Sequence, residues 1–228
     1  PEKSEEELKG IEKRFYKHFS DVMYELVKSL TISERAALKR LRVKNPELVQ
    51  SYYEQGQSVI LYAAHHGNWE LLTYLPLYVP HKVITFYQPL SSKYFDEFMK
   101  LSRARFNLLF APSKNGYRVI ARYVQEKVLT FSFIIGDQRP THDSTVHTTT
   151  LFGNKTNFLV GADRIAKKSN QVVIYPFYRK LKRGCYEIEF KVIDENPKEG
   201  ESYEIIDKYA KLLEAAIQEA PELWLWSH

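Results

Sequence analysis

The stretch SVILYAAHHGNWE, residues 58–70, decides the fold of this chain. Its first seven residues form an almost continuous apolar run, which is typical of a strand buried on both faces of a sheet. Gly67 then permits a tight turn, Asn68 is a good helix cap, and a helix is expected over 69–79. The stretch therefore predicts a strand-to-helix corner that carries two histidines and a glutamate at the end of a buried strand.

Strands and helices alternate along the chain on both sides of this corner. Such alternation predicts an α/β fold, with a central, mostly parallel mixed sheet flanked by helices and preceded by a long N-terminal amphipathic helix. That first helix begins at the cap Ser4, and a second helix is expected over 46–55. The remaining expectations are strands at 82–87, 107–110, 128–135, 171–179 and 185–193, helices at 92–106, 116–126, 158–168 and 202–220, and a loop over 139–157.

Composition limits the class of protein. The 228 residues, 44% of them hydrophobic, fit one domain over 1–228 with a substantial core. The single cysteine, Cys185, excludes an internal disulfide and a multi-cysteine zinc site. No run approaches the roughly 20 apolar residues of a membrane span, and the chain opens on Pro1 without a methionine. We therefore expect a piece of a longer protein that lacks an N-terminal membrane anchor.

The formal net charge of +5 favours acidic partners, such as phosphates, acidic carrier proteins or an anionic membrane face. Charge alone allows nucleic acid equally well. The basic residues are spread along the chain, however, and no recognised nucleic-acid-binding motif is present. A nucleic-acid partner is therefore not expected.

Two expected strands end in polar segments that contain glycine or proline, at residues 65–68 and at residues 136–140. The carboxyl ends of parallel strands open on one edge of a sheet, which is where α/β proteins build their sites. His65 follows the first strand, and Glu70 lies in the first turn of the next helix. A carboxylate there can accept a hydrogen bond from one imidazole nitrogen and leave the other to take a hydroxyl proton. His65 and Glu70 are therefore the candidate general base and orienting acid of an active site.

Three other interpretations of the same residues remain open. A histidine beside a strand is often structural, because imidazoles bond readily to nearby backbone. His66 and Glu70, four residues apart, also fit a surface pair on one helix face. A metal site from His65, His66 and Glu70, helped by His142 or His147, is the third, although the spacing is not the His-Glu-x-x-His of zincins.

The motif His65-x4-Glu70 resembles the signature of the bacterial lipid A late acyltransferases, the lauroyl/myristoyl transferase family of the His-x4-Asp/Glu acyltransferase superfamily. The likeness continues in order along almost all of the chain, and it is this ordered set that is specific. Its further blocks are Tyr87-Gln88-Pro89, Ser102 to Asn107, Gly136-Asp137-Gln138, Leu151-Phe152-Gly153, Gly161 to Ala166, and Ala220 to His228.

The resemblance implies a glycerolipid-acyltransferase-like fold and transfer of a fatty acyl chain to a hydroxyl of a lipid A precursor or related glycolipid. The donor would be acyl carrier protein or coenzyme A, with no cofactor and no metal. Carried over by position, His65 is the general base, Glu70 its partner and Arg103 the arginine beside them. The implied substrate-binding residues are Asn68, Arg105, Asp137, Gln138 and Arg164. From spacing alone, Arg103 reads as an ordinary cation on a helix surface, and Asp137 as a helix cap or loop-orienting residue.

The resemblance also implies partners and a location. These are acyl carrier protein, a glycolipid acceptor and an anionic membrane surface, at the cytoplasmic face of the bacterial inner membrane. Three departures stand out: His66 replaces an aromatic residue, Gln88 replaces an arginine, and the loop 141–150 has no counterpart. Alternatives that remain are a different lipid acceptor, hydrolysis of the thioester, a non-catalytic lipid-binding domain and a nucleic-acid-binding domain.

Overall fold

The computed structural model describes residues 3–88, 91–141 and 144–227. Pro89, His142 and His228, each named above, lie outside the described residues. The helices are α1 (Glu5–Ser29), α2 (Glu34–Arg40), α3 (Pro46–Glu54), α4 (Lys93–Arg103), α5 (Gly116–Gln125), α6 (Gly161–Ser169) and α7 (Glu204–Glu219). The strands are β1 (Leu41–Val43), β2 (Val59–Ala63), β3 (Lys82–Tyr87), β4 (Leu109–Pro112), β5 (Thr130–Ile135), β6 (Val146–Leu151), β7 (Asn154–Leu159), β8 (Val172–Lys182) and β9 (Cys185–Asp194). Short 3-10 helices are η1 (Trp69–Leu77), η2 (Arg105–Asn107), η3 (Ser113–Asn115) and η4 (Pro221–Leu223).

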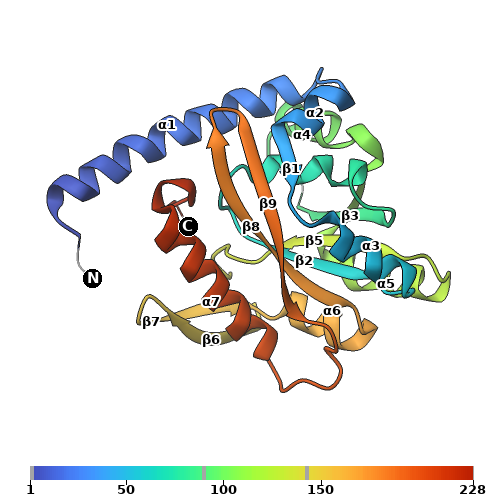
Figure 1. Cartoon of the computed structure of the whole chain (residues 1–228). Coiled ribbons are helices and arrows are strands. Elements are labelled where there is room, and N and C mark those ends of the chain that lie inside the picture. The colour runs from blue at the N-terminus through green and yellow to red at the C-terminus, as the bar shows by residue number, and fades with distance from the viewer. Residues whose placement is uncertain (1–2, 89–90, 142–143, 228) are drawn as a thin grey trace.

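The central sheet has seven strands in the order β1-β9-β8-β2-β5-β3-β4. Its strands pair in parallel, except that β8 and β9 form an antiparallel hairpin (Figure 1). β2 lies between β8 and β5, and in its register with β5 the last residues, Ala63 and Ile135, are partners. The predicted mostly parallel mixed sheet is confirmed, and its middle strands end side by side.

Strand β2 is buried on both faces, as its apolar run predicts. Leu61 and Ala63 pack into the core under α2, α3 and η1, whereas Ile60 and Tyr62 pack into the core under α6 and α7. Side chains alternate along a strand, so one strand joins two cores in a helix–sheet–helix sandwich. This burial fixes the position of the corner that follows β2.

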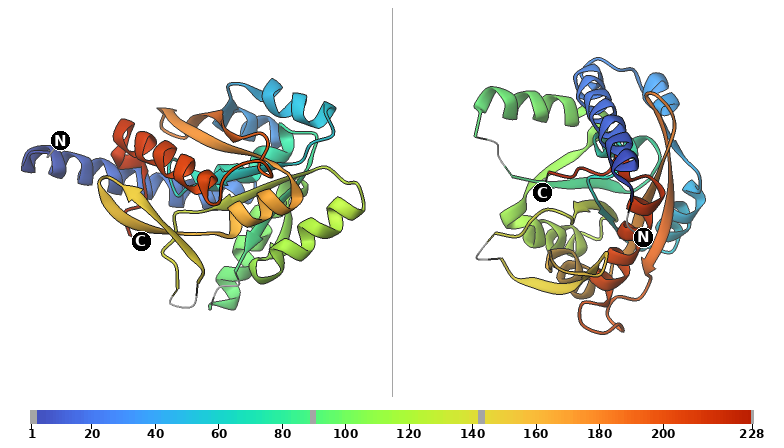
Figure 2. Two further views of the ribbon diagram at one scale, coloured as in Figure 1. Left: turned by 90° about the horizontal axis from the view of Figure 1, so that it is seen from below. Right: turned by 90° about the vertical axis from the view of Figure 1, so that its left-hand side faces the viewer.

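The long N-terminal helix is confirmed as α1. Its start carries a capping box, in which Ser4 and Glu7 bond each other's backbone N–H groups. The first turns of α1 project beyond the sheet, and the helix then runs past the end of the β8–β9 hairpin toward α2 and α4 (Figures 1 and 2). Across the described residues, none of the helices has the length and apolar character to span a bilayer.

The predicted loop over 139–157 is wrong in its second half, where β6 and β7 form an antiparallel hairpin. The run Val146-His147-Thr148-Thr149-Thr150 is rich in β-branched residues, which favour strands. Phe152 and Gly153 both have positive φ and make the two-residue turn. The expected helix after the corner also differs in kind: it is the 3-10 helix η1, with Pro76 inside it.

Candidate active site

The two polar strand ends meet because β2 and β5 are neighbours. The Gly136 amide donates to the Ala63 carbonyl at 2.9 Å, extending the ladder beyond the strands. A Cβ at residue 136 would lie 2.1 Å from the Tyr62 ring, so only glycine fits here. His65 and Asp137, each two residues beyond the last paired residue of its strand, are thereby brought together, as expected for one sheet edge.

Asp137 holds His65 through both carboxylate oxygens. Oδ1 lies 2.8 Å from His65 Nδ1, and Oδ2 accepts from the His65 backbone amide at 2.9 Å. The indole Nε1 of Trp224 also donates to Oδ2, at 2.9 Å. An ionised aspartate only accepts hydrogen bonds, so this arrangement places the His65 ring proton on Nδ1 and makes Nε2 the basic nitrogen.

Glu70 pairs with Arg103 of α4. Arg103 Nε donates to Oε2 at 3.0 Å and Nη2 donates to Oε1 at 2.6 Å, a bidentate pair. The Glu70 side chain is 9% exposed and that of Arg103 26%. The Glu70 carboxylate therefore pairs with a guanidinium that is partly exposed to solvent.

This geometry corrects one assignment. From the sequence, Glu70 was expected to orient His65, but the carboxylate against His65 Nδ1 belongs to Asp137. The physical reason is register: parallel pairing sets residue 137 beside residue 65, whereas η1 carries Glu70 toward α4. The predicted proximity of Arg103 to the site is confirmed, with Glu70 as its direct partner.

The structure separates the two adjacent histidines. His66 is 1% exposed, its Nε2 lies 3.3 Å from the Ala220 carbonyl oxygen, and burial lowers its pKa to about 4. Its backbone forms a bridge with Trp224. His65 faces the opposite way and lines the cavity described next. His66 is therefore a neutral structural residue behind the corner.

A cavity of about 1000 Å³ opens beside His65, Glu70 and Arg103. Most of its wall is apolar and comes from β3, β5, α4 and α6. The main apolar lining residues are Phe86, Phe95, Met99, Phe133, Ile135 and Ile165. A cavity with mostly apolar walls beside His65, Glu70 and Arg103 suits a ligand with a reactive head and a hydrocarbon tail.

Gln138 and Arg164 line this cavity, where sequence analysis expected them, together with Arg139 and Lys168. Arg139 and Arg164 are exposed, and Lys168 Nζ lies 4.9 Å from the centre of the Tyr117 ring. Three cations therefore border the mouth, where an anionic ligand group would be attracted.

Two other expected substrate-binding residues belong to the framework instead. Asn68 is fully buried: its Nδ2 donates to Glu25 at 2.6 Å, and its Oδ1 accepts from the Glu70 amide at 3.2 Å. Arg105 donates to the carbonyl oxygens of Leu30 and Ile32, just after α1. Neither residue lines the cavity; Asn68 bonds to α1, and Arg105 bonds to the residues that follow α1.

A metal site finds no support in this geometry. Across residues 3–88, 91–141 and 144–227, no three His, Cys, Asp or Glu side chains are grouped to hold a metal ion. His147, one of the histidines considered, instead bonds Asp207 of α7 at 3.0 Å and stacks on Tyr203. The hairpin β6–β7 is thereby attached to α7, away from the corner.

The C-terminal segment has a role in the site that the sequence did not predict. The Leu225 amide donates to the His65 carbonyl and the Gly67 amide donates to the Leu223 carbonyl, both at 2.9 Å. With Trp224 bonded to Asp137, the segment 223–225 holds the corner and its carboxylate together. The signal in the sequence was the block Ala220 to His228, which resembles the family but does not indicate which residues the segment contacts.

The bacterial lipid A biosynthesis acyltransferase family model matches residues 1–228, the whole chain. The chain belongs to this family. Its members are acyltransferases, which agrees with the polar pair at the mouth of an apolar cavity. The structure is also similar to the crystal structure of the 1-acyl-sn-glycerophosphate (LPA) acyltransferase PlsC from Thermotoga maritima, with 15% identity and a TM-score of 0.45 over 89% of this chain and 80% of that chain. No curated protein matches in sequence.

Proposed function

We propose that this acyltransferase moves a fatty acyl chain from a thioester to a hydroxyl of a lipid A precursor or related glycolipid. The observation that carries the proposal is the His65–Asp137 pair at the end of an apolar cavity of about 1000 Å³. The donor is acyl carrier protein or coenzyme A. Family membership supports the reaction class, and the cavity supports a long-chain acyl group.

In the proposed mechanism His65 Nε2 takes the proton of the acceptor hydroxyl as its oxygen attacks the thioester carbonyl. Asp137 stabilises the imidazolium that forms. The tetrahedral intermediate then collapses: the C–S bond breaks, the ester carbonyl forms again, and His65 returns the proton to the departing sulfur. Protons balance within the step, so His65 ends the cycle neutral.

Arg103 supports the negative charge that develops on the carbonyl oxygen. Its guanidinium is oriented by the bidentate bond to Glu70, and an arginine keeps donors available beyond that pair. A fixed positive charge near a forming oxyanion stabilises the transition state without reorganisation during the reaction. Glu70 thus acts on Arg103, and Asp137 acts on His65.

The three cations that border the cavity can bind anionic groups of the substrates. Arg139, Arg164 and Lys168 would attract phosphate groups of the acceptor lipid or of the donor's prosthetic group. The net charge of +5 likewise suits an acidic carrier protein and an anionic membrane surface. We place the reaction at the cytoplasmic face of the inner membrane, where such substrates meet.

The test is an assay of the purified protein with acyl-carrier-protein or acyl-coenzyme A thioesters and a lipid A precursor in mixed micelles. The expected product is the precursor with the mass of one added acyl group, found by mass spectrometry. Release of free fatty acid alone, with the acceptor unchanged, would show a hydrolase instead. Loss of one acyl chain from the lipids of cells without the gene is the matching observation in vivo.

A further inference from the structure

Helix α1 lies outside the sheet, yet it contacts the active site at three places. His18 bonds the Gly67 carbonyl, Glu25 bonds Asn68, and Ser29 bonds Ser102. The first two partners lie in the corner after β2, and the third directly precedes Arg103. These three residues of α1 are each buried. One helix therefore bonds to both segments that carry the Glu70–Arg103 pair.

The Glu25 contact leads directly to Glu70. Glu25 Oε2 accepts from Asn68 Nδ2 at 2.6 Å, and Asn68 Oδ1 accepts from the Glu70 amide at 3.2 Å. With its amide oriented by Glu25, Asn68 caps η1 in one defined direction. The backbone of Glu70, and so the position of its carboxylate against Arg103, depends on this chain of bonds.

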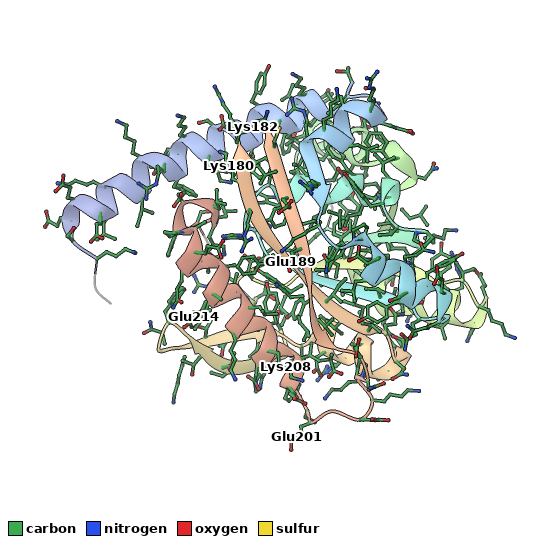
Figure 3. The ribbon with its side chains drawn as sticks, in the orientation of Figure 1. Lys180, Lys182, Glu189, Glu201, Lys208 and Glu214 are labelled. Atoms are coloured by element: carbon green, nitrogen blue, oxygen red, sulfur yellow. The ribbon has the colours of Figure 1, made fainter. Side chains whose placement is uncertain are left out.

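His18 fixes the turn one residue earlier. Its Nε2 donates to the Gly67 carbonyl at 3.0 Å, while Nδ1 accepts from Lys180 Nζ at 3.3 Å. Burial lowers the pKa of His18 to about 4, so the ring is neutral near pH 7 and suits both bonds. Lys180 lies near the end of β8, beside α1 (Figure 3).

The last turn of α1 bonds to the arginine side. Ser29 and Ser102 share a hydrogen bond between their hydroxyl oxygens, and Arg105 reaches the carbonyls of Leu30 and Ile32. Arg103 lies between Ser102 and Arg105. Its backbone is therefore held on one side by α1 and on the other by the residues that directly follow α1.

We propose that Glu25 is a positioning residue for acyl transfer, acting through Asn68 on Glu70 and so on the orientation of Arg103. The inference rests on the function proposed above. It gives α1 a part in catalysis although none of the residues of α1 lines the cavity.

Burying a carboxylate is unfavourable, and burial raises the pKa of Glu25. The side chain is only 5% exposed. An apolar residue would fill the same space without that penalty but could not accept a hydrogen bond from Asn68. The same helix offers a comparison in Asp21, which is 2% exposed and bonds Lys180 and Arg183 at the β8–β9 hairpin. Lys180 also bonds His18, but the chain of bonds from Glu25 through Asn68 to the Glu70 amide does not pass through Asp21.

The experiment compares three variants of the full chain: Glu25→Ala, Glu25→Gln and Asp21→Ala. Glutamine keeps an acceptor oxygen for Asn68, whereas alanine removes it. We expect Glu25→Ala to lower kcat by roughly 10- to 100-fold, because small displacements of catalytic groups have effects of this size. KM for the thioester should stay nearly constant. Glu25→Gln should restore most of kcat, and Asp21→Ala should lower the unfolding temperature while keeping most of kcat.

A second readout does not depend on activity. Amide hydrogen exchange followed by mass spectrometry should rise in the peptide covering 65–72 in Glu25→Ala, and not in Glu25→Gln or Asp21→Ala. Equal losses of kcat in Glu25→Ala and Asp21→Ala at equal losses of stability would overturn the proposal, as would unchanged exchange at 65–72. Should the wild type fail to transfer acyl groups, the proposed function fails, while the exchange comparison still tests the link from Glu25 to the corner.

Discussion

Two polar pairs lie beside the cavity, and they are built differently. His65 and Asp137 follow two adjacent parallel strands, so the hydrogen-bonded register of the sheet brings them together. Glu70 and Arg103 come from η1 and α4, whose relative position depends on helix packing and on α1. The His-x4-Glu spacing therefore does not describe one dyad. It joins one member of each of two pairs.

The difference assigns separate tasks to the two carboxylates. Asp137 bonds an imidazole and an indole, so it sets a tautomer. Glu70 bonds a guanidinium, so it sets the direction of a positive charge. Variants of the two pairs should therefore differ in how far kcat falls and in whether its pH dependence changes. Kinetic measurements can test this difference.

The largest effect is expected from His65→Ala. Removal of a general base lowers the rate by roughly 10²- to 10⁴-fold, and kcat for acyl transfer should fall by that amount. His66→Phe is the matched control, since His66 is buried behind the corner, and it should keep most of the activity. A His66→Phe variant as inactive as His65→Ala would reverse the assignment of the base.

Asp137→Asn is expected to be next, with a loss on the order of 10³-fold, because an amide can donate to Nδ1 and favour the wrong tautomer. The loss should fall on kcat and alter its dependence on pH. Steady-state kinetics across pH 6–9 measure both. A variant with wild-type kcat and pH profile would show that Asp137 does not orient His65.

Glu70→Gln should lower kcat by about 10²-fold, the size typical of one misplaced group that stabilises an oxyanion. Here the pH profile set by His65 should stay unchanged. Arg103→Lys keeps the charge but loses the bidentate geometry, so it should show a similar loss of kcat and the same unchanged pH profile as Glu70→Gln. An altered His65 pH profile in Glu70→Gln would join the two pairs into one unit and remove the distinction drawn above.

His66 gives a prediction on stability. Its pKa in the folded protein is about 4, below the ordinary 6.5, so the unfolded chain takes up the proton first as the pH falls. With respect to His66, the folded protein has its full stability above pH 6.5, and it loses stability as the pH falls from 6.5 to 4. Over that range the free energy of unfolding should fall by roughly 1–3 kcal/mol more in the wild type than in His66→Phe, measured by urea denaturation. Parallel curves for the two proteins would contradict this.

The smallest effect is expected from Trp224→Phe, which removes one donor to Asp137 and leaves the other bonds. A single hydrogen bond contributes about 1 kcal/mol, so kcat should fall about fivefold. The same assay measures it. A loss as large as that of Asp137→Asn would mean that the indole contacts the substrate or holds the whole C-terminal segment in place.

Much of the fold could be predicted because it depends on local pattern. The apolar run 58–64 predicted β2, and the capping residue Ser4 predicted the start of α1. The hairpin β6–β7 was missed because polar threonines in 146–151 read as a loop, although their β-branching favours a strand. The site was predicted in part: His65, Glu70 and Arg103 do lie together.

The pairing within the site could not be predicted from spacing. That β2 and β5 are neighbours is a property of the sheet order, and only this order sets Asp137 beside His65. The roles of Asn68 and Arg105 were misread for a related reason: both bond to α1 or to the residues after it, far away in sequence. Long-range contacts of this kind leave no periodic pattern in the chain.

The most direct test of the account is the protonation of the two ring nitrogens of His65, read from ¹⁵N NMR spectra of the histidine-labelled protein near pH 7.5. We expect a proton on Nδ1 and an unprotonated Nε2 in the wild type and in Glu70→Gln, with a shift away from this tautomer in Asp137→Asn. A proton on Nε2 in the wild type, or a tautomer that changes in Glu70→Gln and not in Asp137→Asn, would contradict it.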